Sequence, residues 1–315
     1  MRDRNLQEGT RRVQSVDEKG AFAVVDIKRC VKDIIAQIDY AFYRTGLKKC
    51  PIEVHTVEET IEELICTDKS MIRFGDGEIT MIRGRSLVLQ QVEPETVEGL
   101  KRLLSYEHEK MIVTIPEIFS DLSIYRKESR QFWKDHLLFS RKTYEKYCNP
   151  AQKYYNTSVS RFYYALEDKG QCGKWAEDIR QIWNDKDVVV VEGERTHNGV
   201  GNDLLDTAKS IERIIGPSAQ AYAKVDEILS CCKEYPKDRL FLVSLGVAAK
   251  FLVEKLFLEG YRALDIGNLD MEYEWYLHQA KGKEKLAKHD IVGEEANREA
   301  GYDAYLAQIR KRISL

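Results

Sequence analysis

Three apolar segments in the second half of the chain constrain its fold most strongly. Asp187–Glu192 contains four consecutive valines, Leu240–Ser244 is apolar up to its last residue, and Ala263–Ile266 follows the next helical segment. Apolar strands that alternate with helices are typical of a parallel sheet that helices cover on both faces. The sequence therefore predicts an α/β protein with a Rossmann-like, mostly parallel sheet.

Other segments supply the remaining elements of this fold. Thr56-Val57-Glu58-Glu59 reads as a capping box that begins a helix extending to Ile65. Apolar runs predict further strands over 70–74, 111–115 and 211–215, and periodic segments predict helices over 94–104, 128–147, 175–183, 225–234 and from Asp203 onward. The charged stretch 294–313 is expected to form a helical surface segment.

The N-terminal part carries one helical pattern of its own. Between residues 21 and 43, apolar side chains recur at helical spacing, among them Val31, Ile34 and Ile38. The opposite face carries both signs of charge, so packing against the core or a second subunit is favoured over a membrane surface, and peripheral membrane contact is the alternative. An exposed apolar stripe on this helix would indicate a homodimer. We divide the chain into an N-terminal helical extension (1–50), a main domain (51–292) and a C-terminal helical tail (293–315).

Composition excludes several classes of protein. The net charge of −3 leaves no basic surplus for a nucleic-acid backbone. Met1–Glu18 is polar, and no apolar run is long enough to span a bilayer, so we expect a cytoplasmic protein. Seven cysteines without a Cys-x-x-Cys pair indicate reduced thiols and neither a disulfide framework nor a zinc site.

Four loops follow predicted strands, where ligands bind in open α/β sheets. In the first, Arg73–Glu78, side chains two residues apart would point the same way if the segment is extended. Asp76 and Glu78 would then converge as ligands for Mg²⁺ or Mn²⁺, which would bind a diphosphate together with Arg73. Gly75 and Gly77 would allow that group to approach closely. The alternative is a solvated Asp-Gly turn.

The second and third loops are candidate phosphate sites. Glu192–Asp203 lies between a predicted strand and a predicted helix, whose N-terminus would attract an anion. The alternative is an ordinary helix entry with Asn202 as its N-cap. For the third loop, Ser244-Leu245-Gly246, the alternative to a phosphate site is an ordinary tight turn. Arg161, between the two halves of the chain, is a candidate phosphate contact, and the alternative is a solvated surface charge. The residues that we predict to bind a nucleotide in these segments are Arg161, Glu194, Arg195, Gly199, Gly201, Asn202, Ser244 and Gly246.

The fourth loop, Asp265–Trp275, gathers acids beside aromatic residues. If it is extended, Asp270, Glu272 and Glu274 share one face; if it is helical, Asp270 and Glu274 are neighbours. Acids at this edge would serve as a general base or as a second metal ligand, and aromatic rings would stack on a base or a sugar. The alternative is the charged start of a surface helix.

Taken in order, these segments resemble the bacterial GT-D type glycosyltransferases. The matching stretches are 73–78, 156–162, 190–203, 242–246 and 265–275, and the resemblance covers residues 54–289. It departs from the family at Gly246-Val247-Ala248-Ala249, where Gly-Pro-Thr-Ala is frequent, and at Asn268, where a histidine is common. The loss of a hydroxyl and a proline argues against a phosphate contact at residues 247–249.

The resemblance implies a Rossmann-like GT-D fold and a metal-dependent enzyme that transfers a hexose, typically glucose, from a UDP-sugar to a growing glycan. Its Asp-x-Glu motif corresponds to Asp76-Gly77-Glu78, so metal and nucleotide binding are expected there. We assign Asp270, Glu272 and Glu274 as catalytic candidates and expect Asp270 to be the base. A metal-dependent nucleotide or phosphoester hydrolase and a non-catalytic nucleotide-binding partner are the alternative hypotheses.

Overall fold

One parallel sheet organises the computed structural model, which describes residues 29–45, 47, 50–289 and 300–315. Within these residues the sheet has nine strands in the order β1-β4-β3-β2-β8-β7-β5-β6-β9, and each pair of neighbours is parallel. The prediction of a Rossmann-like α/β fold is therefore confirmed. The strands are β1 (Glu53–Val54), β2 (Ser70–Arg73), β3 (Met111–Ile115), β4 (Lys153–Asn156), β5 (Asp187–Gly193), β6 (Ser210–Gly216), β7 (Leu240–Ser244), β8 (Arg262–Asp265) and β9 (Ile309–Arg312).

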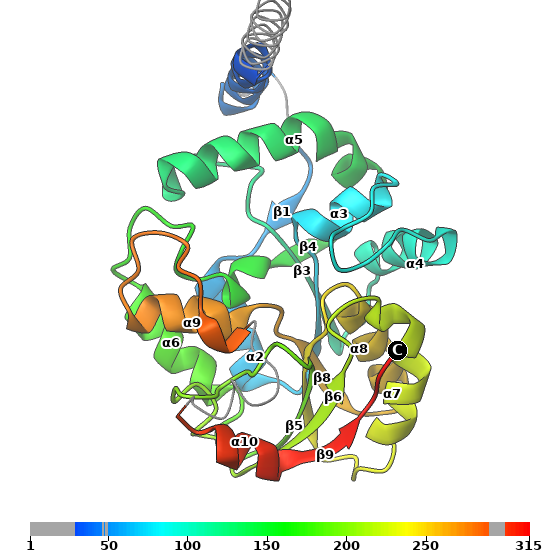
Figure 1. Cartoon of the computed structure of the whole chain (residues 1–315). Coiled ribbons are helices and arrows are strands. Elements are labelled where there is room, and N and C mark those ends of the chain that lie inside the picture. Colours follow the sequence, from blue (N-terminus) through cyan, green and yellow to red (C-terminus); the bar gives the residue numbers. More distant parts are fainter. Residues whose placement is uncertain (1–28, 46, 48–49, 290–299) are drawn as a thin grey trace, which may run out of the picture.

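Helices cover both faces of this sheet. In Figure 1, α2, α6 and α9 lie on one side of the strands and α7 and α8 on the other, while α5 crosses the end of the molecule beside α3. The helices are α2 (Val57–Cys66), α3 (Asp76–Ile82), α4 (Pro94–Leu104), α5 (Lys127–Tyr147), α6 (Cys172–Gln181), α7 (Val225–Cys232), α8 (Ala248–Leu258), α9 (Leu269–Leu277) and α10 (Tyr302–Gln308), with short 3-10 turns η1 (Leu122–Ile124), η2 (Thr157–Ser160), η3 (Ala221–Lys224) and η4 (Ala287–His289).

The amino-acid sequences of three of these elements explain where they begin and how deeply they are buried. The four valines of β5 are fully buried because both faces of the central strands pack against helices. Helix α2 begins at the predicted capping box, in which Glu59 N–H donates to Thr56 Oγ1 (3.1 Å) and Thr56 N–H donates to Glu59 Oε2 (2.9 Å). Helix α8 is apolar on most of its surface because it packs against β2, β7 and β8.

Two predicted elements differ from the structure. No helix follows Asp203, because the connection from β5 to β6 consists of turns throughout residues 194–209. The C-terminal segment is not wholly helical: α10 is followed by β9, which joins the sheet beside β6 and buries Ile313 just beyond it. Ile309 and Ile313 flank three charged residues, 310–312, whose side chains are exposed because β9 is the edge strand of the sheet. The first part of the predicted segment, 294–299, lies outside the described residues. Strands β1 and β4 were not predicted, since they are short and largely polar.

The predicted N-terminal helix is present over residues 29–44, and the rest of its pattern, 21–28, lies outside the described residues. Its contacts with α5 are largely polar, such as Lys32 Nζ to Asp135 Oδ2 at 2.6 Å. Val31, Ile34, Ile35 and Ile38 are about half exposed (48–53%), so an apolar stripe does face outward. This is the condition under which the sequence predicts a dimer. Among the described helices, none has the length and apolar character that a membrane crossing requires.

Candidate active site

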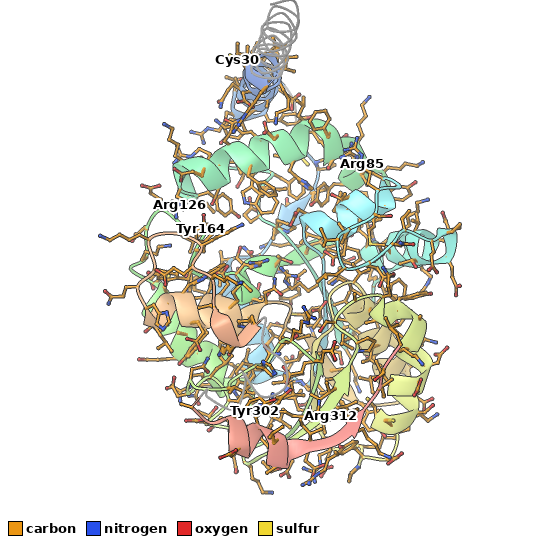
Figure 2. The ribbon with its side chains drawn as sticks, in the orientation of Figure 1. Cys30, Arg85, Arg126, Tyr164, Tyr302 and Arg312 are labelled. Carbon is orange, nitrogen blue, oxygen red and sulfur yellow. The ribbon has the colours of Figure 1, made fainter. Side chains whose placement is uncertain are left out.

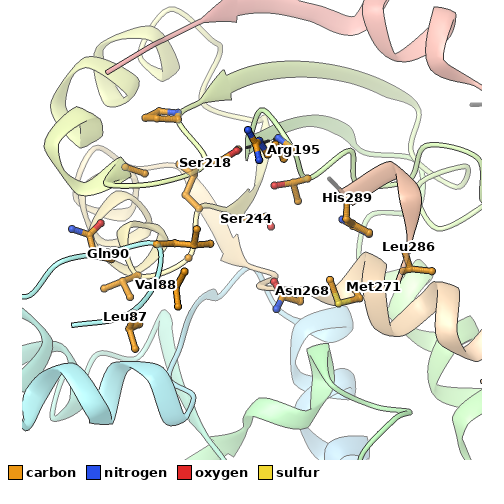
Figure 3. Close-up of a pocket in the computed structure, with 18 of the residues that line it drawn as sticks. Leu87, Val88, Gln90, Arg195, Ser218, Ser244, Asn268, Met271, Leu286 and His289 are labelled. Carbon is orange, nitrogen blue, oxygen red and sulfur yellow. Dashed lines mark hydrogen bonds between the residues drawn. The ribbon is translucent and has the colours of Figure 1, made fainter. Parts of the chain in front are cut away.

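A cavity of about 620 Å³ opens at the carboxyl ends of β5, β7 and β8. Strands β5 and β7 are neighbours, but their connections leave in opposite directions, to β6 and to β8. Such a switch point is where open parallel sheets bind ligands. We call this cavity, shown in Figure 3, the first pocket.

The first pocket has a polar side and an apolar side (Figure 3). Arg195, Ser218 and Ser244 project from strand ends, while Leu87 and Val88 approach from the loop that joins α3 to α4. This loop is fixed by Gln220, whose N–H donates to Leu89 O (2.8 Å) and whose Oε1 accepts from Gln90 Nε2 (3.1 Å). The lining also includes Asn268, Met271, Leu286 and His289. The arrangement suits a ligand with one anionic part and one flat, less polar part.

Sequence reasoning missed the 87–90 loop and the 284–289 segment, which complete this pocket. Val88 is 98% exposed and Leu89 is 59% exposed, which is costly for branched apolar residues in water. An apolar triplet, Leu87-Val88-Leu89, in the middle of a turn-rich segment is the signal that could have found the loop. The segment 284–289 is charged and carried no such signal.

The predicted extended geometry of Arg73–Glu78 is wrong, because α3 begins at Asp76. Residues two apart on a helix point to different sides, so the two carboxylates do not converge. Asp76 is exposed, whereas Glu78 is buried and caps the helix by accepting a hydrogen bond from Gly75 N–H at Oε2 (2.7 Å). Gly77 lies in the first turn, where a Cβ would come 3.1 Å from Leu87 Cδ1.

Glu78 belongs to a buried group of four charges beneath the first pocket. Lys250 Nζ lies 2.8 Å from Glu78 Oε1 and 3.0 Å from Asp265 Oδ2. Arg73 extends alongside, and its Nε has no hydrogen-bond partner among the described residues. Burial opposes ionisation of Glu78, but the charges of Lys250 and Arg73 outweigh it and lower the pKa of this carboxyl. Two cations therefore balance two acids at the junction of β2, β8 and α8.

Of the two predicted metal ligands, Asp76 and Glu78, only Asp76 is available to bind a divalent cation. Asp76 has no hydrogen-bond or ion-pair partner for its side chain among the described residues, so its carboxylate is available. Both oxygens of Glu78 already have partners. Within the described part of the chain no three His, Cys, Asp or Glu side chains gather to hold an ion by themselves. Magnesium bound with a nucleotide takes most of its ligands from phosphate and water, so Asp76 alone fits that demand. The Asp76–Glu78 metal site stays a prediction.

Residues of the Glu192–Asp203 loop have two different roles: some line the first pocket, and others form hydrogen bonds to α9. Arg195 lines the first pocket, whereas Glu194 is exposed and lies outside its lining. The backbone N–H of Gly199 donates to Asp270 Oδ1 (2.7 Å), and Asn202 Nδ2 donates to the same oxygen (2.9 Å). Gly199, Gly201 and Asn202 are also absent from the lining, and the first two adopt positive φ of 73° and 77°. In this arrangement Gly199 and Asn202 hold α9 in place.

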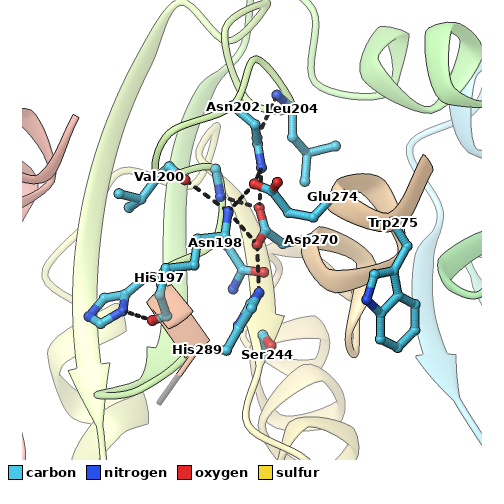
Figure 4. Close-up of polar contacts among 12 residues, drawn as sticks. His197, Asn198, Val200, Asn202, Leu204, Ser244, Asp270, Glu274, Trp275 and His289 are labelled. Carbon is cyan, nitrogen blue, oxygen red and sulfur yellow. Dashed lines mark hydrogen bonds and ion pairs between the residues drawn. The ribbon is translucent and has the colours of Figure 1, made fainter. Parts of the chain in front are cut away.

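The fourth predicted loop is helical, as α9, so the helical alternative is confirmed. Asp270 and Glu274 share one face, where Asn202 Nδ2 donates to both acids (Figure 4). Lys288 Nζ also bridges them, at 2.8 Å from Asp270 Oδ2 and 2.6 Å from Glu274 Oε1. His289 Nε2 lies 2.9 Å from Asp270 Oδ2. Burial opposes ionisation of Asp270, but His289 and Lys288 outweigh it and lower its pKa. This network fastens residues 288–289 beside the first pocket.

Glu272 faces the other way from its two neighbours. It accepts hydrogen bonds from the N–H groups of Tyr163 (3.1 Å) and Tyr164 (2.8 Å) and lies 3.4 Å from Arg161 Nη1. All three acids of α9 are thus held by protein groups. Their assignment as catalytic residues stays a prediction, and the structure gives each of them a positioning contact.

The third loop lines the first pocket as the sequence suggested. Ser244 Oγ donates to Gly267 O (2.7 Å), and Gly246 adopts a positive φ of 54° before α8 begins. Both residues line the pocket. The N-terminal N–H groups of α8 give this side of the pocket a positive potential.

Comparison with known proteins identifies the family to which the chain is related. The sequence profile of the family described as "Glycosyltransferase GT-D fold" matches residues 71–294. A probable glycosyl transferase, Gly, from Streptococcus gordonii is 38% identical over 262 residues, which is 82% of this chain and 38% of that protein. Glycosyltransferase GlyD from Streptococcus pneumoniae serotype 4 is 36% identical over 266 residues, which is 83% of this chain and 33% of that protein. The chain thus spans little more than a third of the length of these curated relatives.

Solved structures cover the same region. A glycosyltransferase (DUF1792) from Streptococcus sanguinis superposes with a TM-score of 0.77 at 38% identity, covering 83% of this chain and 99% of that one. A second structure, described as the highly conserved domain of unknown function 1792 with a distinct glycosyltransferase fold, gives a TM-score of 0.77 at 36% identity over 83% of this chain and 96% of that one.

Proposed function

The chain belongs to the family of glycosyltransferases with the GT-D fold, and from this premise we propose that it transfers a hexose, glucose in the first instance, from a UDP-sugar to a hydroxyl group of a glycan acceptor. The proposal includes dependence on Mn²⁺ or Mg²⁺. It places the reaction in the synthesis of a bacterial glycoprotein, capsule or exopolysaccharide, on the cytoplasmic side of the membrane.

The observation that carries the proposal is the two-sided first pocket. Its volume of about 620 Å³ lies in the range of nucleotide and cofactor sites. A uracil ring would pack against Leu87, Met271 and Leu286, and the diphosphate would lie toward Arg195 and the start of α8. Arg195 would form charge-assisted hydrogen bonds to phosphate oxygens. Residues 247–249 lack the side-chain hydroxyl that is frequent in the family, but the backbone N–H groups at the start of α8 would still add to these contacts.

Asp76 is the residue that we propose to hold a divalent cation, because its carboxylate is exposed and accepts no hydrogen bond from, and forms no ion pair with, another of the described residues. A bound cation would neutralise charge on the departing diphosphate. Glu78 would support Asp76 from beneath, through the turn that its contact with Gly75 N–H fixes.

The bonds exchanged in the proposed reaction balance without a further reactant. The acceptor oxygen bonds to the anomeric carbon of the hexose, and the bond from that carbon to the diphosphate oxygen breaks. Its electron pair leaves with UDP, and the hydroxyl proton passes to a carboxylate or to water. The chain contributes binding, charge neutralisation and the exclusion of bulk water.

Calorimetric titration tests this function directly. UDP, UDP-glucose, UDP-galactose and UDP-N-acetylglucosamine are each titrated into the whole chain, once with Mn²⁺ and once with EDTA. We expect metal-dependent binding of UDP and of one preferred UDP-sugar. Arg195→Met should weaken UDP binding by about tenfold or more, because one charge-assisted contact to phosphate is lost. The matched control, Arg310→Met in β9, removes an exposed arginine that is not part of the pocket lining.

The other outcomes separate the rival functions. Folded protein that binds none of the four compounds contradicts the proposal. Release of free sugar or phosphate at a rate that no acceptor changes would favour a hydrolase. Tight UDP-sugar binding without turnover over a broad acceptor panel would favour a nucleotide-binding partner of a larger complex.

A further inference from the structure

A second cavity, of about 370 Å³, lies at the carboxyl ends of β2, β3 and β4 and beneath α5. We call it the second pocket. It contains residues from six separate parts of the chain: the end of β2 with the start of α3, the residue after β3, the start of α5, the segment around η2, α9 and the 283 loop. In Figure 2, Arg126 and Tyr164 mark the side of this region where the N-terminal end of α5 meets the loops beside α9.

Aromatic side chains form one wall of the second pocket. Phe132 and Trp133 from α5 lie edge to face with centroids 4.9 Å apart, and Tyr125 lies 6.1 Å from Trp133. Phe132 is 48% exposed although it lines a cavity. Tyr164 is held by cations on its ring, with Arg126 at 4.9 Å and Lys283 at 5.4 Å from its centroid. A rigid aromatic wall with an exposed ring suits a ligand with a flat apolar face and polar edges.

Polar groups face this wall, and their charges balance. The lining includes three cations and three acids: Arg73, Arg161 and Lys283, and Asp76, Glu128 and Glu272. Arg161 is steadied by Glu272, which the N–H groups of Tyr163 and Tyr164 fix in turn. Arg73 Nε is buried without a hydrogen-bond partner among the described residues, and Asp76, the residue proposed to hold the cation, belongs to the same lining. Balanced charge and free hydrogen-bonding groups select a neutral, hydroxyl-rich ligand over an anion or a cation.

The two pockets meet at one hydrogen bond. Gly75 and Arg73 line the second pocket, and Glu78 lines the first. Gly75 N–H donates to Glu78 Oε2 at 2.7 Å, so the two linings touch directly. A hydroxyl group held beside Gly75 would therefore lie next to the end of the first pocket that is nearest β2.

From these observations we propose that the second pocket is the acceptor subsite and binds a neutral sugar ring, with the apolar face of the ring on Phe132 and Trp133 and a hydroxyl group directed toward Gly75. This inference rests on the proposed function, because it assumes that the UDP-sugar occupies the first pocket. It adds the class of acceptor, a neutral saccharide, and the residues that recognise it.

Transfer kinetics on the whole chain test the proposal with a matched pair of variants. With UDP-glucose and Mn²⁺ as donor, the acceptors are the methyl β-glycosides of glucose, galactose and N-acetylglucosamine. Phe132→Ala should raise the acceptor KM at least tenfold and leave the Kd of UDP unchanged. The control is Phe139→Ala, which removes a second exposed phenylalanine from α5 (52% exposed) outside the pocket lining and should change neither constant.

Direct binding supplies a readout that needs no donor. Each glycoside, at tens of millimolar, should quench the fluorescence of Trp133, and Trp133→Phe should remove that change while the other three tryptophans remain. Glucose 6-phosphate should bind less well than the neutral glycosides. Quenching by none of the glycosides, or an acceptor KM that Phe132→Ala leaves unchanged in an active enzyme, overturns the acceptor subsite. Failure of the wild type to bind any UDP-sugar overturns the proposed function instead, and the glycoside titration still decides the second pocket.

Discussion

Lys250 and Glu78 form an ion pair of 2.8 Å that is sealed beneath the first pocket, with both side chains less than a tenth exposed. The pair joins the middle of the fold to its loops, since Lys250 belongs to α8 and Glu78 caps the start of α3. Asp265 at the end of β8 shares the same ammonium group at 3.0 Å. A buried lysine on the mostly apolar helix α8 thus sets the position of the Arg73–Glu78 turn.

Lys250→Met should destabilise the protein strongly. The substitution leaves two buried carboxylates without their cation, and removal of one partner from a buried ion pair typically costs about 3–5 kcal/mol. Urea unfolding followed by circular dichroism measures the loss. Lys255→Met on the same helix is the control, because it breaks only an exposed pair with Asp226 and should cost less than about 1 kcal/mol. Equal effects of the two substitutions would contradict a structural role for the buried pair.

Asp76→Asn should abolish transfer and leave the fold intact. The exposed side chain forms no hydrogen bond or ion pair within the described residues, so we expect the midpoint of thermal unfolding to move by only a degree or two. The loss of the charge should lower kcat by about 100-fold or more if Asp76 holds a cation at the diphosphate. Initial rates over a range of Mn²⁺ concentrations measure the effect. A variant with full, metal-dependent activity would remove Asp76 from the site.

His136 should make the protein less stable in mild acid. Burial lowers the pKa of this imidazole to about 4, from an ordinary value of about 6.5. Between these values the unfolded chain binds more protons than the folded one, so stability falls as pH drops from about 6.5 to about 4 and this contribution then levels off. His136→Gln should reduce the loss across that window by about 2 kcal/mol. Unfolding free energies of both proteins at several pH values measure the difference, and parallel curves would refute it.

Gly267→Ala should impair the site through the backbone. Gly267 adopts a positive φ of 51°, and an added Cβ would lie 2.9 Å from Arg73 Nη1. The strained backbone costs about 1–2 kcal/mol, and the displaced guanidinium should raise the KM for the substrates. Gly282→Ala, at a position with open space around it, is the control and should change neither property. Thermal unfolding and steady-state kinetics compare the two, and identical behaviour would argue that Arg73 has no role.

The sequence by itself determined the central sheet and the edge at which the site lies. The valines of β5 and the apolar run of β7 required burial on both faces, which only a helix-covered parallel sheet supplies. The capping box at Thr56, the helical spacing of α5 and the glycine-bearing loops after β5 and β7 likewise follow from local chemistry.

Only the tertiary structure decided the role of each polar residue. Spacing along the chain left Asp76 and Glu78 as equal candidates for metal ligands. In the fold, Lys250, more than 170 positions away, forms an ion pair with Glu78, whereas Asp76 stays exposed. Asp270 and Glu272 point to opposite sides of α9, toward Lys288 and toward Arg161. The Leu87–Gln90 loop and the aromatic wall on α5 reach the site through contacts between distant segments. A carboxylate is stabilised by whichever cation and N–H groups the fold brings within reach, and local sequence does not contain that information.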